Sequence, residues 1–301
     1  MFKNRIFKFI DIEDQYNLNN IKNDELLCKF FDSFNDPYEG HFGVSSIWPD
    51  PCRESEKLRS LISRLSPEGA EINTASIESM IQYIKTNNHL QEFTRKFLYR
   101  ETEKYRICSF TRRWNHILMW SHYSKGGSGA TLVFDERVVG NNGWARRPGI
   151  EEELKGIALP LKWVVYKKKP PVINAVEVFE LVKVASEKLR EKVSNEIFEK
   201  CIFTKYETWR YEQESRLVVR IDDEIARDSI LYKYPKGALK GIIIGNKCSE
   251  ESYRILADSV NDSVVFYLAK QSSHRYKYEI SGSFLAGDIR SEKVEIRKML
   301  E

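Results

Sequence analysis

The sequence predicts an α+β fold: a mixed, mostly antiparallel central sheet, a helical insertion at about 53–104 and one long helix at about 174–201. Short apolar and aromatic runs, which are typical of strands, occur near the start of the chain and return in its last third. Helical periodicity is concentrated between them. Strands and helices therefore do not alternate regularly, as a parallel α/β sheet would require.

The N-terminal part begins with two predicted strands, Arg5–Asp11 and Glu25–Phe31. A turn follows at Asn35-Asp36-Pro37, because Asn and Asp bond their own backbone and Pro fixes φ. Residues Arg53–Leu65 carry leucine and isoleucine at helical spacing, and a longer helical pattern covers about 76–104. These two patterns form the predicted helical insertion.

The middle of the chain contains two predicted strands, Tyr105–Thr111 and Ala130–Asp135, with a short helix between them at Asn115–Ser124. Asn115 is the expected N-cap of this helix, and Gly126 is expected to end it. Residues 136–156 are polar and rich in Gly, Asn, Arg and Glu, without a sustained period. This composition predicts a surface loop or insertion.

The C-terminal part begins with a strand at Leu161–Tyr166 and continues into the long helix. Asn174 and Glu177 form a start that resembles a capping box, and an apolar stripe continues to about residue 201. One further helix is expected near Ser249–Ser259. The remaining predicted strands are Glu214–Ile221, Ile230–Tyr234, Leu239–Ile244, Val264–Ala269 and Tyr276–Ile280.

The composition indicates a soluble, cytoplasmic, globular protein. Of 301 residues, 42% are hydrophobic and 31% are charged, which is too apolar for a disordered chain. No apolar run approaches the roughly 18 residues of a membrane span, and the first residues lack the apolar stretch of a secretory signal. The five cysteines never form a CxxC motif, which is typical of a reduced protein without structural zinc.

The charge balance and the length limit the domain organisation and the partners. A net charge of +4 is much weaker than the basic excess usual in a duplex-binding domain. The length allows one large domain. We therefore expect a single α+β domain over residues 1–301, with segments 53–104 and 136–156 as insertions.

The first candidate site is the turn that contains Asn35, Asp36, Tyr38 and Glu39. Its carboxylates could contact a substrate or a metal ion, with the amide and the phenol beside them. The alternative is an Asx turn whose side chains satisfy only local amides.

The second candidate site is the helix that carries Trp120, His122 and Tyr123, just before the glycine-rich segment 126–129. A histidine beside a glycine-rich connection could act in acid–base catalysis. The GGSG run leads from a helix into a strand and does not match a phosphate-binding loop. The alternative is a pair of core aromatic residues with a structural histidine.

The third candidate site lies in the segment 205–217. A strand over residues 211–219 would place Glu212, Glu214 and Arg216 on one face, because side chains alternate along a strand. Two such carboxylates can divide acid and base roles when their environments separate their pKa values. Trp209 and Tyr211 add aromatic surface beside them. The alternative is an exposed salt-bridge ladder on a sheet face.

The fourth candidate site is a set of short basic clusters at Arg112-Arg113, Arg146-Arg147 and Lys167–Lys169. Such clusters are usually solvated faces. A composite groove for nucleic acid, built from all three, is the functional alternative.

Together and in this order, the motifs resemble a bacterial family known as domain of unknown function 2971. The resemblance covers about residues 5–245 and implies no activity by itself. It rests on the FNDPYE turn, the CSFT strand at Cys108–Thr111, the MWSHYSKGGSGATLVFD run and the WRYEQESR segment.

The order of the motifs is also similar to that of ADP-ribosyltransferase-like folds. This resemblance implies that a late glutamate orients the nicotinamide ribose of NAD, here Glu214 in the first place and Glu212 as the alternative. Phe7 and Phe9 stand in the first strand where a polar anchor for NAD would be expected. The resulting catalytic candidates are Glu214, Glu212 and His122. The substrate-binding candidates are Asn35, Asp36, Tyr38, Glu39, Ser109, Trp120, Tyr123, Trp209 and Arg216.

The resemblance implies an NAD-directed enzyme, an ADP-ribosyltransferase or an NAD glycohydrolase, acting as a toxin or an anti-phage defence effector. NAD would be its substrate, and a protein or a nucleic acid would be the acceptor of a transferred group. One alternative is a metal-dependent hydrolase or nuclease that uses the same carboxylates with Mg²⁺ or Mn²⁺. The other is a non-enzymatic binding module. The sequence implies no resident metal and no membrane partner, and it leaves the oligomeric state open.

Overall fold

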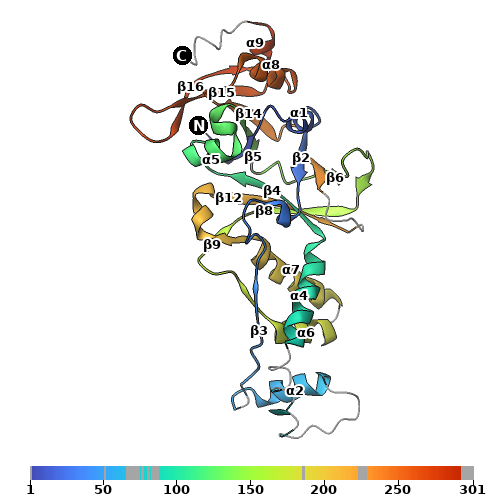
Figure 1. Cartoon of the computed structure of the whole chain (residues 1–301). Helices are drawn as coiled ribbons and strands as arrows, with labels where there is room; N and C mark the ends of the chain where they lie inside the picture. The colour runs from blue at the N-terminus through green and yellow to red at the C-terminus, as the bar shows by residue number, and fades with distance from the viewer. Residues whose placement is uncertain are drawn as a thin grey trace. The chain divides into compact units, whose positions relative to one another are not determined.

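The computed structural model describes residues 2–50, 52–65, 75, 78–79, 82, 88–184, 187–222 and 229–292. The chain divides into two compact units, and Figure 1 labels many of their elements. Unit 1 comprises Met1–Asn35, Lys104–Tyr166 and Glu207–Glu301, and unit 2 comprises Asp36–Glu103 and Lys167–Tyr206. The predicted helical insertion thus belongs to unit 2, together with residues from a later part of the chain.

Unit 1 is built on an eight-stranded mixed sheet, which confirms the predicted α+β fold. Strands β14 and β15 are parallel, and the other neighbouring strands of this sheet are antiparallel. In spatial order the strands are β16 (Tyr278–Leu285), β15 (Val265–Gln271), β14 (Leu239–Ile244), β5 (Ala130–Asp135), β1 (Arg5–Ile10), β4 (Tyr105–Thr111), β12 (Glu214–Ile221) and β8 (Gly156–Trp163).

A second, four-stranded sheet of unit 1 corrects the loop predicted over residues 136–156. Two of its strands, β6 (Trp144–Arg146) and β7 (Glu153–Leu154), come from this segment. They join β2 (Glu25–Cys28) and β13 (Ile230–Lys233). Strands of two and three residues are too short to show a period of two, so the sequence pattern could not reveal them.

The helices of unit 1 are short. They are α1 (Gln15–Lys22), α5 (Ile117–Tyr123), α8 (Glu250–Asp258) and α9 (Ala286–Arg290), with the 3₁₀ turns η1 (Phe31–Ser33), η2 (Lys125–Gly127) and η3 (Glu207–Glu212). Helix α5 begins after His116, so the predicted cap at Asn115 is wrong. Gly126 follows this helix with a φ of 65°, a conformation that glycine adopts without strain.

Unit 2 contains most of the predicted helical segments. Its helices are α2 (Ser55–Leu65), α4 (His89–Thr102), α6 (Ala175–Val184) and α7 (Glu187–Ile202), and β3 (Gly43–Ser45) pairs in parallel with β10 (Val172–Asn174). The long helix predicted over 174–201 is described as α6 and α7, and residues 185–186 lie outside the described residues, as do most of residues 66–87. The predicted start at Asn174 is confirmed, because its Oδ1 accepts from Val176 N at 3.2 Å. Strands β9 (Val165–Lys167) and β11 (Thr204–Tyr206) lie near the points where the chain passes between the units.

The eight-stranded sheet has two different faces. Leu217 and Val219 of β12 pack in the large core with Cys108 and Phe110 of β4. Because side chains alternate, Glu214 and Arg216 lie on the opposite face. In the part of the chain that the structure describes, no helix has the length and apolar character to cross a membrane.

Candidate functional site

Glu214 and Arg216 form a buried ion pair on this second sheet face. Arg216 donates from Nε to Glu214 Oε1 at 2.7 Å and from Nη2 to Oε2 at 3.0 Å. Ser109, which lies opposite Arg216 on β4, donates from Oγ to Glu214 Oε1 at 2.6 Å. Both Glu214 and Arg216 are buried, so the exposed salt-bridge ladder is excluded. The guanidinium therefore contacts both oxygens of this carboxylate through charge-assisted hydrogen bonds.

Glu212 does not share a strand with Glu214, contrary to the predicted common face. It ends the 3₁₀ turn η3, and the strand begins only at Glu214. Gln213 between them has a φ of 43°, a left-handed conformation that interrupts the alternation of side chains. Thr111 fixes this turn, because its Oγ1 donates to the backbone oxygen of Glu212 at 2.5 Å.

The Glu212 side chain is buried and bonded to α5. Tyr123 donates from Oη to Glu212 Oε1 at 2.5 Å, and Asn35 donates from Nδ2 to Tyr123 Oη at 2.9 Å. Burial and the neighbouring Glu212 carboxylate raise the pKa of Tyr123 far above its ordinary value. The phenol therefore stays protonated and remains a donor. These contacts bring together three residues that the sequence placed in separate motifs.

A set of aromatic rings, here called the aromatic rim, surrounds Tyr211 beside this carboxylate. Tyr211 stacks on His116 with ring centroids 5.6 Å apart, and it lies 6.2 Å from Trp209 and 6.3 Å from His122. His122 also contacts Tyr123 at 6.2 Å and is exposed. Burial, reinforced by the charge of Arg113, lowers the pKa of His116. The rim thus places flat, partly exposed rings next to a fixed carboxylate.

Trp120 occupies the core and presents no face to a ligand. Its side chain is 1% exposed, and it packs with Phe7 and Val133. Its Nε1 donates to the backbone oxygen of Trp114 at 2.7 Å. This placement agrees with the core interpretation of the second motif and not with stacking on nicotinamide.

The turn at Asn35-Asp36-Pro37 is divided between the two units. Asp36 Oδ1 accepts from Tyr38 N at 2.9 Å, which is the Asx turn that the alternative interpretation predicted. Glu39 is buried in unit 2 and lies 3.7 Å from Lys205 Nζ. Tyr38 is exposed. From this motif, Asn35 is connected to Glu212 through the hydroxyl group of Tyr123.

Two residues of the site escaped the sequence patterns. Thr111 was visible only as the last residue of a strand. Tyr166 Oη accepts a hydrogen bond from the backbone N–H of Glu214, with an N–O distance of 2.8 Å. Beyond its place at the end of the predicted strand 161–166, no sequence signal marks Tyr166, because the contact joins residues 48 positions apart in the chain.

The basic clusters are only partly available to a ligand. Arg146 is buried, and its Nε and Nη2 donate to Glu25 at 2.6 and 2.9 Å. Arg112 lies over the ring of Trp163 at 3.1 Å and pairs with Glu136 at 3.2 Å. The composite groove predicted from all three clusters therefore loses Arg146, which serves the four-stranded sheet instead.

A metal-dependent mechanism would need a group of ligands. Within the described residues, no three His, Cys, Asp or Glu side chains are grouped as a metal site would require.

The comparisons with known proteins give one family match, which covers part of the chain. No curated protein and no solved structure matches the chain. The segment 119–217 contains the MWSHYSKGGSGATLVFD and WRYEQESR motifs, whereas the FNDPYE turn and the CSFT strand lie before it. Residues 119–217 match the model of the DUF2971 family, described as a protein of unknown function, and this match supports the predicted resemblance over that segment of the chain.

Proposed function

We propose that this protein acts on NAD and breaks the bond between nicotinamide and ribose, as an ADP-ribosyltransferase or an NAD glycohydrolase. The observation that carries the proposal is the buried Glu212 carboxylate, held by Tyr123 beside the aromatic rim. A fixed carboxylate in a site with little water stabilises positive charge that develops at the ribose C1′. Flat rings next to it provide surface for the nicotinamide ring.

In this proposal Glu212 takes the role that the resemblance gave first to Glu214. Both oxygens of Glu214 accept hydrogen bonds from Arg216, and one also accepts from Ser109. A carboxylate bonded in this way is suited to hold the side chains of Arg216 and Ser109 in place. Glu212 accepts a hydrogen bond from the phenol of Tyr123, and in this proposal its carboxylate stabilises an oxocarbenium-like transition state.

The reaction needs only an acceptor with a proton to lose. Nicotinamide leaves as a neutral molecule with the electrons of the broken bond. Water, or a hydroxyl group of an acceptor, then bonds to C1′ and releases its proton. An enzyme that depletes NAD in this way would act as a toxin or an anti-phage effector.

The test is nicotinamide release from NAD by the purified protein, followed by chromatography. We expect Glu212→Gln to lower turnover at least a hundredfold, on the order of the loss when one charge-stabilising group is removed. The matched control is Glu207→Gln, which changes a glutamate of the same 3₁₀ turn and should retain activity. If the unchanged protein releases no nicotinamide and NAD leaves its melting temperature unaltered, the proposal is wrong.

A further inference from the structure

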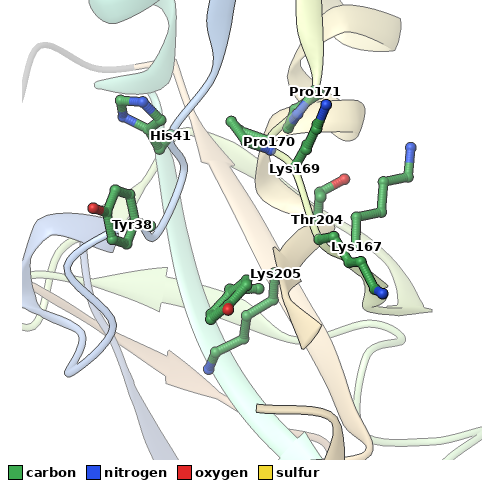
Figure 2. A pocket seen from close by; sticks show the side chains of 10 residues that line it. Tyr38, His41, Lys167, Lys169, Pro170, Pro171, Thr204 and Lys205 are labelled. Atoms are coloured by element: carbon green, nitrogen blue, oxygen red, sulfur yellow. The ribbon is translucent and has the colours of Figure 1, made fainter. Parts of the chain in front are cut away.

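Unit 2 contains a pocket that the proposed function does not use. Its volume is about 330 Å³, within the range of small-ligand sites. Figure 2 shows Tyr38 and His41 on one side of it and the segment from Lys167 to Pro171 on the other. All of its lining residues belong to unit 2, so the pocket is complete within one compact unit.

The pocket carries an excess of positive charge. Lys167, Lys168 and Lys169 are exposed, and none of them forms an ion pair with a residue that the structure describes. Three consecutive lysines in the wall of one pocket attract an anion with several charges. Pro170 and Pro171 follow directly and restrict the backbone of this segment.

Lys205 lines the same pocket, but its charge is compensated. Its side chain is 3% exposed and lies 3.7 Å from Glu39, whose side chain is 1% exposed. This buried ion pair links the segment that carries Glu39 to the segment that carries Lys205. The excess charge of the pocket therefore comes from the three exposed lysines.

Two tyrosines in the pocket are unusually exposed. Tyr38 is 64% exposed and Tyr206 is 47% exposed. Tyr38 contacts His41 edge to face, with ring centroids 5.7 Å apart, and this contact restrains its ring. Exposed rings beside cations are the combination that proteins use to stack bases and hold phosphates.

We propose that this pocket binds a nucleotide, with the base stacked on a tyrosine and the phosphates held by Lys167–Lys169. A bare anion would use the lysines and leave the tyrosines without a role. A purely apolar ligand would gain nothing from three ammonium groups. The base and phosphate could come from a free mononucleotide or from single-stranded nucleic acid, in which each base exposes a face for stacking. The proposal is independent of the chemistry at Glu212.

Calorimetric titration and fluorescence anisotropy test the pocket on the full chain without any turnover. The probes are AMP, ATP, inorganic phosphate, a labelled ten-residue oligothymidylate and the same length of duplex DNA. We expect ATP or the oligothymidylate to bind at least tenfold more tightly than phosphate, and duplex to bind more weakly than the single strand. Preference for ATP identifies a mononucleotide site, and preference for the oligothymidylate identifies a single-strand site. Equal affinity for phosphate and ATP, preference for duplex, or binding of none of the probes overturns the proposal.

Variants separate stacking from charge. Tyr206→Ala should weaken binding about tenfold, because one stacked base contributes on the order of this factor, whereas Tyr206→Phe keeps the ring and the affinity. The matched control is Tyr276→Ala, which removes a 97% exposed ring of unit 1. If Tyr206→Ala and Tyr38→Ala both bind as the unchanged protein does, no base is stacked and the proposal fails.

The lysines are tested through the salt dependence. For a single strand, each phosphate contact contributes about −0.7 to the slope of log K against log salt. Lys167→Gln with Lys169→Gln should therefore make the slope shallower by roughly 1.4. Lys240→Gln with Lys247→Gln removes the same charge from exposed positions of unit 1 and should leave the slope unchanged. An equal effect of both pairs would assign binding to net charge and not to the pocket.

Discussion

Among the residues that the structure describes in unit 1, Arg216 with Glu214 and Arg146 with Glu25 form buried pairs of the same construction, but the pairs differ in what lies beside them. Arg216 contacts both oxygens of Glu214 on β12, and Arg146 contacts both oxygens of Glu25 across the four-stranded sheet. All of these residues are buried. A buried arginine–glutamate pair with two hydrogen bonds thus occurs in each of the two sheets of unit 1. The presence of such a pair beside Glu212 is therefore not by itself evidence of catalysis.

The difference between the two regions is a second carboxylate that is itself buried. Near Glu214, the chain supplies Glu212, which is bonded by the neutral phenol of Tyr123 and lies beside the aromatic rim. At the other pair, Arg146 donates to the backbone oxygens of Arg147 and Ile150, and its Nη1 lies 3.5 Å from the exposed carboxylate of Glu151. The comparison directs functional tests to Glu212 and structural tests to the two ion pairs.

The largest effect is expected from breaking either pair. Arg216→Met and Arg146→Met each leave a buried carboxylate without its cation, which should lower the free energy of unfolding by about 3–5 kcal/mol. Urea denaturation followed by circular dichroism measures this loss. If the pairs are equivalent, the two losses agree within about 1 kcal/mol.

The control replaces both partners of one pair. Glu25→Leu with Arg146→Met removes the buried charge altogether and should recover most of the stability lost in Arg146→Met alone. A double variant as unstable as the single one would mean that the pair fixes the geometry of the sheet beyond its charges.

An intermediate effect is expected from Tyr123→Phe. The change removes the donor to Glu212 while keeping the ring, so a buried oxygen loses its hydrogen bond at a cost of about 1–3 kcal/mol in stability. Nicotinamide release should fall about tenfold, a smaller loss than in Glu212→Gln, because the carboxylate is still present. Tyr276→Phe, at an exposed position, is the control for both measurements. Unchanged stability would show that Tyr123 does not hold Glu212.

The smallest effect concerns pH and His116. Burial and Arg113 lower the pKa of this histidine in the folded protein, so the unfolded chain binds its proton more tightly. Stability from this residue is therefore present above the ordinary histidine pKa of about 6.5 and is lost as the pH falls below it. His116→Gln should reduce the fall in melting temperature between pH 7.5 and 5.5, whereas His274→Gln at an exposed position should not. An identical fall in both variants would contradict the assignment.

Part of the fold and of the site could be read from the sequence. Strands β4, β5 and β12 begin and end where their apolar runs predicted, because buried strands with clear flanking turns have unmistakable boundaries. Short strands such as β6 depend on partners far along the chain and carry no local pattern. Within the site, the sequence predicted that Glu214 and Arg216 share a face of the strand, but it did not predict the direction of the Glu212 side chain. Its direction depends on Thr111 and Tyr123, which reach it from β4 and α5.

The left-handed turn at Gln213 separates two like charges that adjacent strand positions would otherwise bring together. In a continuous strand, Glu212 and Glu214 would stand about 7 Å apart on one face and repel each other at close range. With Gln213 at a φ of 43°, Glu214 faces a cation and Glu212 faces a phenol. One strained backbone residue therefore gives two chemically identical side chains separate surroundings, so that the same residue type supports the sheet at one position and, in the proposed function, acts on NAD at the other.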